Sequence, residues 1–128
     1  MADELPRVLA LLTATSVEHD GPTNTHTIRG VTKFLLVGRL PVEAPLGFYV
    51  SLDGVVGRVP VMVRLVAPSG EVVHAFGADA DFRDREHVIN LPYTQTITFR
   101  EEGCYRVQVL AHGSVLLERT LAVEVARR

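Results

Sequence analysis

The sequence has little of what secreted and membrane proteins need. Cys104 is the only cysteine, so an intramolecular disulfide is excluded, as is usual in a reducing compartment. The longest apolar runs, such as residues 8–12 and 34–37, are far shorter than the ~20 residues that span a bilayer. The first residues carry acids and a proline in place of a basic, apolar leader. We therefore predict a cytoplasmic protein without a membrane partner.

Basic charge is also scarce. The net charge is −2, Lys33 is the only lysine, and the arginines are scattered along the chain. The pair Arg83 and Arg85 lies among acidic residues, and Arg127 and Arg128 end the chain. Because a nucleic-acid partner requires a basic stripe that neutralises phosphates, we predict no nucleic-acid binding.

What the chain does have is enough apolar material for a core. Its 128 residues fit one domain, and 47% hydrophobic with 22% charged residues is ordinary for a globular protein. A chain of this length buries roughly two thirds of the surface that its unfolded form exposes. We therefore interpret residues 1–128 as a single domain that needs neither a disulfide nor a structural metal.

The strongest pattern is a two-residue alternation near the C-terminus, over residues 105–111 and 115–125. Such alternation places one side of a strand on a core and the other side toward water. Gly113-Ser114 between the two runs suits a type II′ hairpin turn. Arg119 is the one charge in the inward register, and a bulge or an edge position would let it reach solvent. The predicted inward residues are Tyr105, Val107, Val109, Ala111, Val115, Leu117, Leu121, Val123 and Val125.

Similar short runs occur along the rest of the chain, separated by turn residues. Pro92 should mark a bend, a bulge or an edge strand, because proline lacks the amide proton that a ladder needs. Residues 79–86 read either as one helical turn or as a charged loop. The further expected strands cover residues 7–15, 27–37, 48–52, 61–66, 71–76, 87–92 and 95–99. This spacing predicts an all-β, antiparallel β-sandwich of about seven to nine strands.

Four segments resemble a family of short bacterial uncharacterised proteins, a domain of unknown function. They are residues 8–12, 28–31, 63–70 and 99–109. The resemblance implies an immunoglobulin-like β-sandwich and brings no activity with it. An antibody-type domain is not expected, because the chain has no tryptophan and no second cysteine. Tyr105 follows Cys104 instead of preceding it by two residues, so the tyrosine-corner pattern is not expected either.

Candidate chemistry is weak throughout. The histidines share no short ligand spacing, and we predict no metal site. The acidic run 79–86 lacks the central glycine and the bidentate glutamate of a calcium loop. Cys104 has no catalytic partner in the sequence, and we interpret it as a small buried residue. We predict no cofactor and no catalytic residue, and a non-enzymatic role is the leading interpretation.

Apolar side chains in the outward register are the remaining signal, because an exposed apolar patch marks a partner surface. Edge strands also offer unpaired backbone groups to a second chain. We therefore predict a protein-binding or assembly module that acts through a sheet face or an edge strand, with a protein partner or a second copy as in a homodimer. The alternative is a ligand- or metal-binding sandwich, or an enzyme, whose pocket uses His26, His74, His87 and nearby acids. The predicted interface residues are Met62, Arg64, Val66, Leu110 and Leu116.

Overall fold

The computed structural model describes residues 4–23 and 25–126, and every regular element in these ranges is a β-strand. No helix long and apolar enough to cross a bilayer occurs in these ranges. Because all the regular elements are strands, the all-β prediction is confirmed. The strands are β1 (Arg7–Asp20), β2 (Thr25–Val31), β3 (Phe34–Val37), β4 (Val42–Asp53), β5 (Gly57–Val66), β6 (Val72–Phe82), β7 (Ile89–Phe99), β8 (Gly103–Ala111) and β9 (Ser114–Val125).

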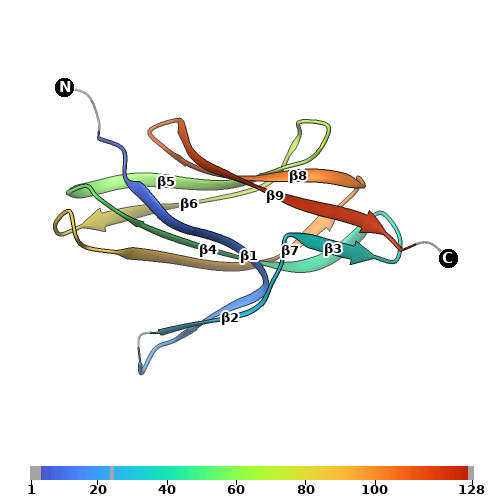
Figure 1. Cartoon of the computed structure of the whole chain (residues 1–128), viewed down its shortest axis with the longest axis horizontal. Coiled ribbons are helices and arrows are strands. Elements are labelled where there is room, and N and C mark those ends of the chain that lie inside the picture. Colours follow the sequence, from blue (N-terminus) through green and yellow to red (C-terminus); the bar gives the residue numbers. More distant parts are fainter. Residues whose placement is uncertain (1–3, 24, 127–128) are drawn as a thin grey trace.

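The strands form two packed sheets (Figure 1). Sheet A has the order β2-β1-β4-β7, and sheet B has the order β3-β9-β8-β5-β6. All pairs are antiparallel except β3 with β9, which is parallel. The order β1-β4-β7 matches strands A-B-E of an immunoglobulin sandwich, and β9-β8-β5 matches G-F-C, with β6 in the place of C′. The predicted immunoglobulin-like sandwich is confirmed, with nine strands in the described ranges.

The core lies between the sheets and is built mainly from valine and leucine, with a few aromatic rings. The alternation predicted for β8 is confirmed, since Tyr105, Val107 and Val109 are fully buried. Across the sandwich, the rings of Phe76 on β6 and Tyr93 on β7 stack with their centroids 3.9 Å apart. This contact joins an edge strand of sheet B to an edge strand of sheet A.

The last hairpin differs from the prediction by one residue. Ala111 pairs with Ser114, so the turn residues are His112 and Gly113, with φ of 50° and 78°. Two positive φ values are typical of a type I′ turn, which replaces the predicted type II′ turn at Gly113-Ser114.

A register shift follows in the same hairpin, between Val109 and Leu110, which pair with Leu117 and Val115. Leu116 is thus the extra residue of a β-bulge, and it packs against the core. Val115, predicted to point inward, is 48% exposed. A bulge reverses the facing of the residues beyond it, because side chains alternate along a strand.

A tyrosine corner is present, contrary to the prediction. The Tyr105 hydroxyl donates to the carbonyl oxygen of Glu101 at 2.8 Å and accepts from the Glu101 amide at 3.2 Å. Tyr105 stands near the start of β8, the F strand, as this motif requires. The position two residues later is the buried Val107 in place of a cysteine, so a search for the Tyr-x-Cys spacing misses the corner. Cys104, predicted to be buried, is exposed.

Three other segments differ from the expected strands. Residues 79–82 continue β6, so the acidic run forms neither a helical turn nor one continuous loop. β7 runs without a break through Pro92, which is tolerated because β7 is an edge strand of sheet A. The run 27–37 divides into β2 in sheet A and β3 in sheet B.

The second half of β1 crosses the outer face of sheet A. β1 pairs with β4 as far as Ala14, and beyond that residue it pairs only with β2. The Thr94 hydroxyl on β7 accepts from the Val17 amide at 3.0 Å and donates to the Val17 carbonyl at 3.1 Å. A Cβ on Gly47 would lie 3.0 Å from backbone atoms of Ser16 and Val17, so glycine favours this close crossing. β2 consequently lies below the two layers in Figure 1, on the side away from sheet B.

Candidate interaction face

The outer face of sheet B carries an apolar row that runs across four strands. Met62 on β5 pairs with Gly77 on β6 and with Leu110 on β8, and Leu110 pairs with Val115 on β9. Directly paired residues share one face of a sheet. Met62 is 46% exposed and Val115 48%, whereas Leu110 between them is 7% exposed. The row therefore presents two exposed apolar side chains on either side of a buried one.

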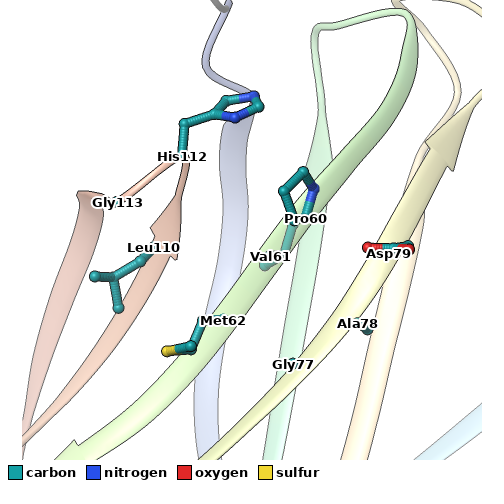
Figure 2. A pocket seen from close by; sticks show the side chains of 9 residues that line it. All are labelled: Pro60, Val61, Met62, Gly77, Ala78, Asp79, Leu110, His112 and Gly113. Atoms are coloured by element: carbon teal, nitrogen blue, oxygen red, sulfur yellow. The ribbon is translucent and has the colours of Figure 1, made fainter.

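A hollow of about 510 Å³ opens next to this row (Figure 2). Its walls come from β5, β6 and the β8–β9 turn, and most of its lining is apolar. Asp79 lies on the β6 side of the hollow and His112 on the side of the turn. Because Gly77 has no side chain, the surface beside Met62 forms a depression. The lining residues are Pro60, Val61, Met62, Gly77, Ala78, Asp79, Leu110, His112 and Gly113.

A polar ladder borders the apolar row on the same face. Arg64 Nε donates to Gln108 Oε1 at 2.6 Å, and Gln108 Nε2 donates to Glu118 Oε1 at 2.7 Å. The guanidinium of Arg106 lies 3.6 Å from the same Glu118 oxygen. Gln108 is 7% exposed, so its amide is held in place by partners on both sides. A fixed polar border beside an apolar patch is the usual layout of a protein interface.

The five residues predicted for an interface fall into different environments. Met62 is exposed on the apolar row, and Arg64 is half-buried in the polar ladder. Leu110 and Val66 belong to the outer face but are only 7% and 4% exposed. Leu116 does not belong to the face, since the bulge turns it toward the core. The structure thus brings Met62, Arg64, Val66 and Leu110 together and leaves Leu116 out.

Comparison with known proteins gives the fold and no function. No protein-family model and no curated protein matches the chain. A DNA-bound alkylpurine DNA glycosylase, AlkC, from Pseudomonas fluorescens is similar at a TM-score of 0.59 and 12% identity, over 96% of this chain and 31% of that one. A β-glucosidase from Listeria innocua in complex with gluconolactone is similar at a TM-score of 0.50 and 14% identity, over 97% of this chain and 17% of that one. An immunoglobulin-like protein from Pseudomonas aeruginosa has a TM-score of 0.43 and 15% identity, over 97% of this chain and 100% of that one.

The chain therefore spans about a third and a sixth of the two larger proteins. At such low identity the likeness shows the sandwich fold alone, and the activities of those proteins stay with them.

Sequence reasoning missed Gly77 and Val115, which complete the apolar row. A glycine inside a strand is a signal for close approach of another group, and Gly77 lies in the middle of β6. The exposure of Val115 could not be predicted, because the residues around Leu116 are apolar in both registers and the sequence pattern therefore does not show the bulge.

The three histidines of the alternative pocket lie apart. His26 Nδ1 is 3.4 Å from Nδ1 of His19 on the β1–β2 hairpin. His74 Nε2 is 3.1 Å from the Tyr93 hydroxyl. His87 accepts a backbone amide at the turn after β6. Within residues 4–23 and 25–126, no three histidine, cysteine or acidic residues gather to hold a metal ion. The described residues therefore do not form the pocket that the alternative would require from His26, His74 and His87.

The clearest ion pairs lie at the corner where β1 begins. Arg7 bonds Asp53 through Nε at 2.9 Å and through a terminal nitrogen at 3.0 Å, which raises the pKa of Arg7. Arg85 bonds Glu4 at 2.9 Å and lowers the pKa of that carboxyl. These pairs hold Glu4 and Arg7 against the end of β4 and the β6–β7 turn. They involve none of the residues of the polar ladder on sheet B.

Proposed function

We propose that this protein is a non-enzymatic assembly module that binds a protein through the outer face of sheet B, with a second copy of the chain as its first partner. The apolar row with its adjacent hollow carries the proposal. Met62 supplies a projecting side chain, and the surface beside Gly77 supplies a depression about 510 Å³ in volume. Apolar patches with polar borders are where soluble domains associate.

The choice of face follows from the topology. The outer face of sheet A is crossed by the second half of β1, which the Thr94 hydroxyl holds through Val17. The ring of His26 also lies 5.7 Å from Tyr49 on that face. In sheet B, by contrast, the four strands of the apolar row lie open in Figure 1. The docking of a flat partner is therefore favoured on sheet B.

Self-association is favoured by the pattern on the face. In a two-fold dimer each surface feature meets the same patch of the partner, so a projection must lie near a depression. Met62 and Gly77 are directly paired, which places the two features side by side. The border carries both signs of charge in Arg64, Arg106 and Glu118, so two copies would not face each other with like charges alone.

The test is the oligomeric state of Met62→Asp. A carboxylate in the apolar row would have to be buried without a partner on association, which costs several kcal/mol. We expect a wild-type dimer by analytical ultracentrifugation and at least about a hundredfold weaker association of the variant. Circular dichroism should stay unchanged, since Met62 is exposed.

The matched control is Val56→Asp. Val56 is 60% exposed in the β4–β5 turn, away from the row, so the same change of charge should leave the dimer intact. A wild-type protein that stays monomeric into the millimolar range, or equal weakening by both variants, would refute self-association.

A small apolar ligand is a second candidate for the same hollow. Its volume lies within the range of roughly 300–1,000 Å³ that is typical of small-molecule sites, and Asp79 and His112 could fix the orientation of a polar end. The amphipathic dye ANS tests it. Binding by a monomeric wild type that Met62→Asp abolishes would favour this candidate, and no binding would remove it.

The DNA seen with AlkC is not carried over to this chain. With a net charge of −2 and scattered arginines, the sequence offers no continuous basic stripe for a phosphate backbone. The proposal therefore remains with a protein partner.

A further inference from the structure

A second, smaller pocket lies at the seam between the two sheets. Its volume is about 170 Å³, and its walls come from β1, the β2–β3 link and β9. It contains the only lysine of the chain, Lys33, together with Arg119. The lining residues are Leu11, Leu12, Thr13, Val31, Thr32, Lys33, Arg119 and Thr120.

Arg119 occupies a position that would normally hold a core residue. It pairs with Val107, which is fully buried, and the flanking inward position of β9 is the buried Leu121. Arg119 itself is exposed. The sequence marked it as the one charge in the inward register, and the structure places it at the seam, where β9 faces β1 and the side chain can reach solvent.

The backbone around the pocket is firmly held. The Thr32 amide donates to the Thr13 carbonyl at 2.9 Å, and the Thr13 hydroxyl donates back to the Thr32 carbonyl. The Ala122 amide donates to the Lys33 carbonyl at 2.8 Å. These bonds tie the link to both β1 and β9 and hold the pocket walls in place.

Neither cation has a counter-charge among residues 4–23 and 25–126. Among the described residues, no hydrogen bond or ion pair joins the side chains of Lys33 and Arg119 to another group. Two positive charges that line one small pocket together attract an anion. Arginine and lysine are also the usual ligands of phosphate groups, arginine through paired N–H donors and lysine as a point charge.

We propose that this seam pocket binds a phosphate group. Two cations match the charge of about −1.5 to −2 on a phosphate monoester at neutral pH better than a single carboxylate. The volume of about 170 Å³ is below the roughly 300 Å³ at which sites for whole small molecules begin, so the pocket takes the terminal group of a larger ligand. The site is independent of the apolar row on sheet B.

The probe is inorganic phosphate, titrated against chloride at constant ionic strength. We expect saturable shifts of the amide NMR signals of Thr32, Lys33 and Thr120, with a dissociation constant of about 1 mM or lower. The double variant Lys33→Gln and Arg119→Gln should bind at least about tenfold more weakly, because it removes both charge-assisted contacts.

The control is the double variant Arg58→Gln and Arg100→Gln, which removes two positive charges elsewhere and should leave the dissociation constant unchanged. A parallel titration with acetate separates a phosphate site from a carboxylate site. The proposal is overturned by shifts that do not saturate, by equal losses in the two double variants, or by acetate binding as tightly as phosphate.

Discussion

At the scale of single residues, Tyr105 connects the fold to its stability. Its ring is fully buried and lies edge-on to Phe99, with centroids 5.4 Å apart, while its hydroxyl makes two bonds to the backbone of Glu101. Tyr105→Phe keeps the ring and removes both bonds. We expect the free energy of unfolding to fall by about 1–2 kcal/mol in urea titrations, since a lost buried hydrogen bond costs that much.

Tyr49→Phe is the matched control. The Tyr49 ring is half-buried on the outer side of sheet A, where it lies next to the ring of His26. We expect its loss of stability to stay below about 0.5 kcal/mol. Equal losses in the two variants would mean that the corner contributes nothing special.

The same hydroxyl makes stability depend on alkaline pH. Burial raises the pKa of Tyr105 above its ordinary value of 10.0. The folded state then keeps a proton that the unfolded chain releases, so this contribution is fully present below pH 10 and is lost as pH rises through the folded-state pKa. Melting temperatures measured on both sides of this value should fall more steeply for the wild type than for Tyr105→Phe. Parallel curves would contradict this assignment.

At the scale of elements, the crossing of β1 over β4 depends on Gly47. An added Cβ would meet the backbone of Ser16 and Val17 at 3.0 Å, and a backbone cannot move aside as a side chain can. We expect Gly47→Ala to lower the free energy of unfolding by about 1–3 kcal/mol, the usual cost of overpacking. Hydrogen exchange of the Val17 amide should quicken, because its bond to Thr94 is strained.

Gly38→Ala serves as the comparison, because an added Cβ there would meet no atom within 4 Å. Its stability should change by less than about 0.5 kcal/mol. If Gly47→Ala were equally mild, the hairpin would have to lie farther from β4 than the structure shows.

Strands were easier to predict from the sequence than their details. The alternation in residues 105–111 is unambiguous because both core and solvent positions are clear, and β8 follows it. In β9, Val115, Leu116 and Leu117 are apolar in succession. Periodicity alone cannot tell which of them points inward, and the bulge at Leu116 decides it. The strand at residues 79–82 was not predicted for another reason, because charged residues on an edge strand resemble a loop.

The candidate face shows the same limit. Met62 was predicted because it interrupts an alternating strand, and it is exposed. Val66 and Leu110 share its register but are buried. A single sequence does not reveal such burial, because it does not show which strands are neighbours. The seam pocket could not be predicted for the same reason. It forms only where β1 meets β9 and where the β2–β3 link lies against both strands.

At the scale of the whole molecule, most of the sheet structure joins distant parts of the chain. β1 pairs with β4, β4 with β7, β5 with β8, and β3 with β9. Loop closure must precede each of these pairings, which slows folding. We expect the main refolding phase on a timescale of milliseconds to seconds in stopped-flow experiments. Complete refolding in microseconds would contradict this topology.

The lone thiol adds a practical consequence. Cys104 is exposed, and its strand partner Ala122 also pairs with Phe34, which is 46% exposed at the β3 end of sheet B. The protein thus carries one natural attachment point for a fluorophore or spin label, on the side of the molecule that we expect a partner to approach. Its distance to an identical label on a second molecule would report directly how two copies are oriented.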